Sequence, residues 1–185
     1  MELSGAIIRA EIISVSRVRD LVRQLSNVEW RPSAIAERHA VTRVRELVDE
    51  KQRDALSAGH DRAAEICDET LSEIAPESFN LVRKYWGLAL SKTSAPQFTK
   101  YKNKHFIATH RDTGEAYPDR LFSVVTYLTE EYSGGEIVFP GLRKSLHPRV
   151  GETLIFPSDM LHSVNPVETG EKQIFLFFID RHPAT

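Results

Sequence analysis

The chain has 185 residues, of which 41% are hydrophobic and 27% are charged, and its formal net charge is −2. This length and composition fit one globular domain with a single core. A nearly neutral charge without a basic run gives no reason to expect nucleic acid as a partner. No segment approaches the roughly 20 apolar residues of a membrane span, and the first residues lack the features of a secretory leader. We expect no membrane partner, and the oligomeric state is left open.

The cysteine content indicates a reducing compartment. Cys67 is the single cysteine in the sequence, so no disulfide can form within the chain. Its neighbours Ala63, Ala64 and Ile66 are apolar, which favours a buried structural thiol over a reactive one. We therefore expect a cytoplasmic protein.

Residues 1 to about 90 are predicted to be helical, because apolar residues recur at three- and four-residue spacing. The three stripes are Val15, Val18, Val22 and Leu25; Ala40, Val44, Leu47 and Val48; and Ala63, Cys67, Leu71 and Ile74. Ser14 is the expected N-cap of the first helix, and Pro76 is expected to end the third. A further helix is expected from Phe79 to Trp86, with its end near Gly87.

From about residue 96 the pattern changes to short β-rich runs separated by Gly, Pro and Asp. Strands are predicted near residues 96–101, 105–111, 121–129, 135–139, 143–147, 152–156, 160–165 and 172–180. Many short strands at this spacing favour a β-sandwich or barrel. The sequence thus predicts one domain over residues 1–185, in which residues 1–90 form a helical support for a β-rich core at 91–185.

His110 and Asp112 form the first part of a candidate metal site. In a strand, residues i and i+2 point to the same face, so an imidazole and a carboxylate could be presented together. His162, arriving from a distant strand, would add a second imidazole. Two histidines and one carboxylate form the set that leaves open positions on a non-haem Fe(II). Alone the His-x-Asp pair is a weak signal, and His162 could also be a surface residue in a turn.

The runs that surround this pair follow a specific order. They are FTKY at 98–101, HRD at 110–112, RLFSVVTYLT at 120–129, GGEIVFP at 134–140, GETLIFP at 151–157 and HSVNPVETGEK at 162–172. Taken together they resemble the Fe(II)/2-oxoglutarate dioxygenases, and within them the prolyl 4-hydroxylase-like branch. The resemblance covers about residues 96 to 181. It implies a mainly β, α+β fold: a double-stranded β-helix, or jelly roll, with supporting helices.

The resemblance also implies Fe(II), 2-oxoglutarate and O2 as cofactors, with ascorbate in a supporting role. It assigns the iron ligands to His110, Asp112 and His162. A second group of residues is implied to bind 2-oxoglutarate. Lys172 matches the lysine that binds the distal carboxylate, Tyr101 matches a hydrogen-bonding tyrosine, and Ser123 and Tyr127 match positions that present hydroxyl groups.

The implied reaction is hydroxylation of an unactivated C–H bond with release of succinate and CO2. The substrate would be an amino acid, a peptidyl residue or a small natural product, and the segments at 113–120 and 29–32 are candidates for its contacts. Ile107 departs from the family, since many relatives carry an aromatic residue there. The alternative is a non-catalytic jelly-roll module that binds a metal or ligand, or acts as a sensor. The remaining histidines are interpreted as structural or surface residues: His39, His60, His105, His147 and His182.

Overall fold

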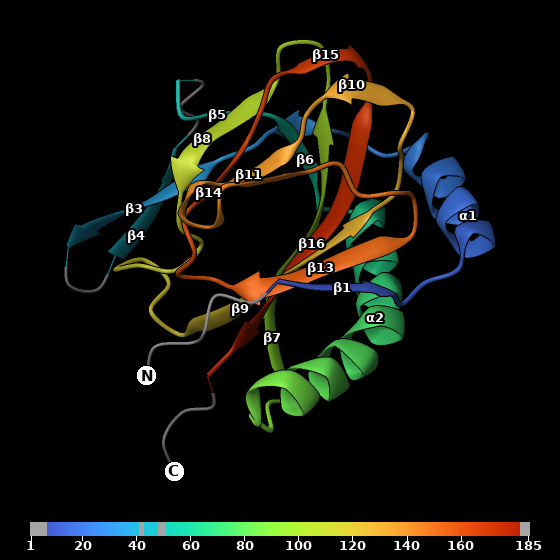
Figure 1. Cartoon of the computed structure of the whole chain (residues 1–185). Coiled ribbons are helices and arrows are strands. Elements are labelled where there is room, and N and C mark those ends of the chain that lie inside the picture. Colours follow the sequence, from blue (N-terminus) through green and yellow to red (C-terminus); the bar gives the residue numbers. More distant parts are fainter. Residues whose placement is uncertain (1–6, 41–42, 48–50, 182–185) are drawn as a thin grey trace.

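Two antiparallel β-sheets face each other, and two helices lie along one side of the larger sheet (Figure 1). This computed structural model describes residues 7–40, 43–47 and 51–181. The arrangement is the predicted jelly roll. The larger sheet has the order β1 (Ile8–Glu11), β13 (Glu152–Pro157), β9 (Arg120–Tyr127), β16 (Lys172–Asp180), β7 (Lys92–Tyr101), β6 (Leu56–Ala58) and β2 (Arg31–Pro32).

The smaller sheet carries five strands and packs against the larger one through a shared hydrophobic cluster. Its order is β12 (Lys144–Leu146), β11 (Ile137–Phe139), β14 (His162–Val164), β8 (Phe106–His110) and β5 (Arg53–Asp54). Two further pairs are β10 (Tyr132–Gly134) with β15 (Val167–Gly170), and β3 (Ile35–Ala40) with β4 (Arg43–Leu47). A short 3-10 helix, Pro140–Leu142, follows β11.

The first predicted helix is confirmed as α1, Val15–Leu25, and its N-cap is Ser14. The Ser14 hydroxyl accepts a hydrogen bond from the backbone N–H of Arg17 at 3.2 Å, which satisfies one of the free amide groups of the first turn. The buried face is formed by Val18, Leu21 and Leu25, whereas Val15 is exposed.

The second helix, α2, runs without a break over Arg62–Trp86, so the prediction that Pro76 ends a helix is wrong. A proline inside a helix removes one backbone hydrogen bond and costs about 3 kcal/mol. That cost is offset because Ile74 and Val82, on either side of the proline, are fully buried against the sheet. The expected end is confirmed: Gly87 adopts φ +69°, the left-handed conformation that commonly closes a helix.

The predicted helix with Ala40, Val44 and Leu47 is wrong as well, because these residues form the β3–β4 hairpin; Val48 lies outside the described residues. The register places Ile35 opposite Leu47. Short apolar patterns cannot separate a helix from a pair of strands by spacing alone. Residues 1–90 therefore do more than support the core. Strands β1, β2 and β6 extend the larger sheet, and β5 extends the smaller one.

The side chains of the central strands alternate between two hydrophobic clusters. In β16, Phe175 and Phe177 pack with both helices, whereas Ile174 and Leu176 point to the space between the sheets. This is the period of two that a strand imposes on its side chains. The outer face is therefore closed by helices, and the inner face is available for a site. Neither helix of the described chain combines the length and apolarity needed to cross a bilayer.

We predict that Gly134→Ala destabilises the fold by about 2 kcal/mol or more. Gly134 has φ +68°, and an added Cβ would lie 2.2 Å from the carbonyl oxygen of Pro166. Both the left-handed backbone and this overlap disfavour alanine. Urea unfolding curves measure the change, with Gly114→Ala as the matched control, since a Cβ there meets nothing within 4 Å. Equal midpoints for the two variants would contradict the prediction.

Candidate metal and cosubstrate site

The two predicted histidine ligands are direct cross-strand partners. His110 ends β8, and the register of β8 with β14 places it opposite His162. Facing residues of antiparallel strands have Cβ atoms about 5 Å apart, so both imidazoles start from neighbouring positions. Their ring centroids lie 4.3 Å apart. Strand pairing thus brings together two residues that are distant in the sequence.

Backbone carbonyls orient both imidazoles. The Nδ1 atom of His110 lies 2.9 Å from the carbonyl oxygen of Ala108, and the Nδ1 atom of His162 lies 3.0 Å from that of Met160. A carbonyl oxygen only accepts, so each Nδ1 carries the hydrogen and each Nε2 keeps a free lone pair. In metal-binding histidines, a hydrogen bond from the ring nitrogen that does not bind the metal usually fixes the orientation of the ring.

Asp112 completes the cluster, but from a loop. Strand β8 ends at His110, so the strand alternation used in the sequence prediction does not position the carboxylate. Instead, the backbone N–H of Asp112 donates to the carbonyl oxygen of Ser158 at 2.9 Å. The Ser123 hydroxyl donates to Oδ2 at 2.6 Å and also lies 3.0 Å from the Ser158 hydroxyl.

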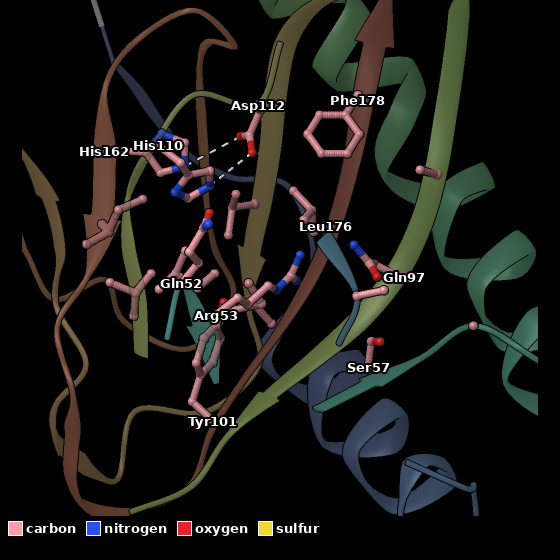
Figure 2. Close-up of a pocket in the computed structure, with 18 of the residues that line it drawn as sticks. Gln52, Arg53, Ser57, Gln97, Tyr101, His110, Asp112, His162, Leu176 and Phe178 are labelled. Atoms are coloured by element: carbon pink, nitrogen blue, oxygen red, sulfur yellow. Dashed lines mark ion pairs between the residues drawn. The ribbon is translucent and has the colours of Figure 1, made fainter. Parts of the chain in front are cut away.

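The distances and charges of the cluster fit a divalent cation. The Nε2 atoms of His110 and His162 lie 3.3 and 3.5 Å from the two Asp112 oxygens, and all ligand atoms lie within 4.8 Å of one another. Neighbouring ligands around one ion are about 3 Å apart when the bonds are about 2.1 Å. Two histidines and one carboxylate on a single face are the donor set of non-haem Fe(II) sites. The three side chains are shown together in Figure 2.

The protonation states also suit a metal. Burial alone would raise the pKa of Asp112, but the nearby His162 and His110 and the hydrogen bond from Ser123 hold that pKa well below its usual range. Burial lowers the pKa of His162. An ionised carboxylate and a neutral imidazole are the forms that bind a metal ion.

The cluster opens into a pocket of about 590 Å³ whose inner part contains a buried lysine. Lys172 begins β16, and the register places it opposite Tyr101 of β7. The lysine is 1% exposed, and its ammonium donates to the carbonyl oxygen of Gly135 at 2.7 Å. The ammonium also lies 5.1 and 5.2 Å from the ring centroids of Tyr101 and Tyr127.

This lysine is a positive charge without an acidic partner. Among the residues that the structure describes, no carboxylate forms an ion pair with Lys172. Desolvation lowers its pKa to about 7, and the more distant Glu136 offsets this only in part. Burial raises the pKa of Tyr101 to about 12, so its hydroxyl is a neutral donor. An ammonium and a phenol in one pocket fit the distal carboxylate of 2-oxoglutarate.

The predicted cosubstrate residues divide into two groups. Lys172, Tyr101 and Tyr127 line the pocket together. Ser123 faces the same side of β9 as Tyr127, but it is fully buried behind Asp112 and its hydroxyl is engaged there. This contact favours a role in holding the carboxylate over the predicted contact with the cosubstrate.

Both candidate substrate segments reach the pocket, through Tyr117 and Arg120 and through Arg31 and Pro32. Several lining residues were not predicted, because no metal or catalytic motif marks them. They are Gln52, Arg53, Ser57, Gln97, Leu176 and Phe178, shown in Figure 2, together with His60, interpreted from the sequence as structural or on the surface. His105 lies 3.6 Å from Asp54, and His147 stacks on Tyr132. The side chain of His39 and all of His182 lie outside the described residues.

Comparison with known proteins finds similarity to oxygenases and hydroxylases. Residues 96–180 match the family model described as the 2OG-Fe(II) oxygenase superfamily. This match covers less than half of the 185 residues of the chain. It is 30% identical over 118 residues to a PKHD-type hydroxylase of Colwellia psychrerythraea, a match that covers 52% of this chain and 53% of that protein. The chain thus spans about half the length of the curated relatives it matches.

Solved structures of prolyl hydroxylases share the fold. A Pseudomonas putida prolyl-4-hydroxylase superposes with a TM-score of 0.72 and 21% identity, covering 97% of this chain and 95% of that one. A Trichoplax adhaerens prolyl hydroxylase, in complex with a hypoxia inducible factor peptide fragment, has a TM-score of 0.74 and 17% identity. That match covers 95% of this chain and 83% of the other. At sequence identities this low, the similarity shows a shared fold, that is, the jelly roll and its helices.

We predict that Ser123→Ala weakens binding of Mn(II), used as a redox-stable probe, by about 10-fold or more. Loss of a hydrogen bond that holds a metal-binding side chain typically costs 10- to 100-fold in affinity. Calorimetric titration of the purified protein measures the affinity. Ser133→Ala is the control, because that hydroxyl pairs with Thr169 on the β10–β15 hairpin. Equal losses in both variants would argue against a specific role for Ser123.

Proposed function

We propose that the protein is an Fe(II)- and 2-oxoglutarate-dependent dioxygenase that hydroxylates an unactivated C–H bond. One observation carries the proposal: the His110, Asp112 and His162 cluster and the buried Lys172 line the same pocket. A metal-binding module alone gives no reason to bury an unpaired ammonium beside the metal site. The two groups together match the two ends of 2-oxoglutarate.

Each group has a separate task in this proposal. His110, Asp112 and His162 would hold the metal ion, and all three side chains line the pocket. Lys172, with Tyr101 and Tyr127, orients the cosubstrate through its distal carboxylate. When bound, Fe(II) with 2-oxoglutarate and O2 supplies the oxidation of the substrate, with release of succinate and CO2. The apolar lining keeps water out, and its residues are Val125, Ile137, Val164, Ile174 and Leu176.

The substrate in this proposal is an amino acid, a peptidyl residue or a small natural product. The hydroxylase names of the relatives support hydroxylation, and the peptide complex of the Trichoplax enzyme supports a peptidyl or small substrate. Ascorbate is expected to support turnover. The cytoplasmic location indicated by the single, buried Cys67 stays a prediction, as does the division into one domain.

We predict that Fe(II) or Mn(II) stabilises the wild type, and that His110→Ala, Asp112→Ala and His162→Ala lose both this effect and 2-oxoglutarate turnover. A ligand at about 100 times its dissociation constant adds about 2.7 kcal/mol, or roughly 5–10 °C for a chain of this size. Thermal melts with and without metal measure the shift, and succinate release measures turnover.

His147→Ala is the control for the ligand variants, because His147 does not line the pocket. It should keep the metal-dependent shift. A His162→Ala variant with full turnover would contradict the ligand assignment. Metal binding without any turnover of 2-oxoglutarate would favour the non-catalytic module instead.

We predict that Lys172→Ala lowers the affinity for 2-oxoglutarate by about 30-fold or more, while metal affinity is little changed. Removing one partner of a buried charge pair costs about 2–5 kcal/mol, and each 1.4 kcal/mol is about tenfold. Lys172→Arg should be intermediate, because a guanidinium can pair with a carboxylate but needs more room. Titration of the anaerobic Fe(II) protein, followed by its charge-transfer absorbance, measures the affinity.

The pH dependence of the same titration tests whether the positive charge of Lys172, and not only the volume of its side chain, contributes to 2-oxoglutarate binding. Because the pKa of Lys172 is about 7 before the cosubstrate binds, its ammonium is progressively lost above that pH. The wild-type affinity should be constant below pH 7 and fall by up to about tenfold per pH unit above it. Lys172→Ala should lack this slope. Wild-type affinity in the variant would mean that the cosubstrate binds elsewhere.

A further inference from the structure

Two arginines from opposite sheets line the pocket. Arg53 lies on β5 of the smaller sheet, opposite Ile107 of β8, and Arg120 begins β9 of the larger sheet. Both line the cavity that contains the metal cluster. Figure 2 shows Arg53 on the wall of this cavity, on the same side as Tyr101. The sheets thus hold two guanidinium groups beside the site from either side.

The Arg120 guanidinium is fixed in place by aromatic rings. Its Cζ atom lies 3.6 Å from the ring centroids of both Tyr117 and Phe178, so the planar group stacks between them. One Nη donates to the backbone oxygen of Asp112 at 3.3 Å. The Nε–H is buried and has no hydrogen-bond partner among the residues that the structure describes. The guanidinium is therefore oriented in advance, but its donors are only partly used.

Arg53 shares this feature with Arg120: its Nε–H is also buried and has no hydrogen-bond partner among the described residues. Within the described part of the chain, no carboxylate forms an ion pair with Arg53 or Arg120, and the two positive charges repel each other. Several other arginines do have acidic partners, including Arg31, which also lines the pocket. These pairs are Arg9–Glu152, Arg17–Glu73 and Arg31–Glu29. Arg53 and Arg120 thus carry a positive charge that the described part of the protein balances only in part, through Asp112 and Asp180 near Arg120.

We propose that the substrate is a small carboxylic acid whose carboxylate binds between Arg53 and Arg120. This inference rests on the proposed function, because the cosubstrate accounts for the other charges. Its distal carboxylate pairs with Lys172, and its other end lies at the metal. The two guanidinium groups then require a third anionic group. A carboxylate matches the planar fork of arginine donors, and a cavity of about 590 Å³ shared with the cosubstrate leaves room for a small molecule.

The test uses the wild-type protein with Mn(II) and saturating 2-oxoglutarate, so that ligands bind without turnover. The probes are the proteinogenic L-amino acids and short straight-chain monocarboxylic acids, each compared with its primary amide, and inorganic phosphate as a separate anion. Thermal shifts identify binders, and calorimetry measures their affinities. We expect at least one acid to bind with an affinity about 30-fold or more above that of its amide.

Three variants locate the binding site. Arg53→Gln should lower the affinity for the selected acid by about 30-fold or more. Arg120→Lys keeps the charge but loses the planar fork, so it should also bind the acid more weakly. Arg19→Gln, on the exposed side of α1, makes the same change in charge as Arg53→Gln and should bind like the wild type. All three variants should keep the wild-type affinity for 2-oxoglutarate.

Several results would overturn the inference. Amides that bind as tightly as their acids, binding of phosphate alone, or no binding by any acid would each do so. A loss of 2-oxoglutarate affinity in Arg53→Gln would instead assign this arginine to the cosubstrate. Failure of the proposed function is distinguishable, because the wild type would then show no response to Mn(II) and 2-oxoglutarate before any probe is added.

Discussion

The register of two antiparallel strand pairs determines where chemistry can take place in this protein. Pairing of β8 with β14 places His110 opposite His162, and pairing of β7 with β16 places Tyr101 opposite Lys172. A shift of one residue in either pair would turn these side chains to the opposite face of the sheet. The helices contribute indirectly: they bury the outer face of β9 and β16, so that the register is enforced by the core.

Burial of the Lys172 ammonium has an energetic cost that the stability of the fold alone does not explain. Burying an ammonium costs several kcal/mol unless it is paired. Among the described residues, Lys172 is compensated by the carbonyl oxygen of Gly135, by nearby aromatic rings and in part by the more distant Glu136. An apolar residue of similar size would fill this position without that cost. The unpaired charge is therefore best explained by a ligand. The same argument applies to Arg53 and Arg120, whose buried Nε–H groups also lack hydrogen-bond partners among the described residues of this pocket.

The sequence indicated the site mainly through its resemblance to a known family. That resemblance implied Lys172, His110 and His162, and the structure places the two histidines opposite each other on paired strands. The route by which Asp112 reaches the cluster was not predictable, because it depends on contacts with Ser123 and Ser158 across the fold. The hairpin over Ile35–Ala40 and Arg43–Leu47 was missed because its apolar spacing also fits a helix.

The lack of a regular pattern also explains why the other pocket residues were harder to predict from the sequence than the metal ligands. The family model begins at residue 96, whereas Arg53, Ser57 and Arg31 reach the pocket from short strands before it. Such two- and three-residue strands carry almost no periodic signal. Strand β6 pairs with β7 and β5 pairs with β8, two strands that also carry site residues, and β2 pairs with β6. The part of the chain that departs most from a regular pattern thus lines the same pocket as the long strands that carry Lys172 and Tyr101.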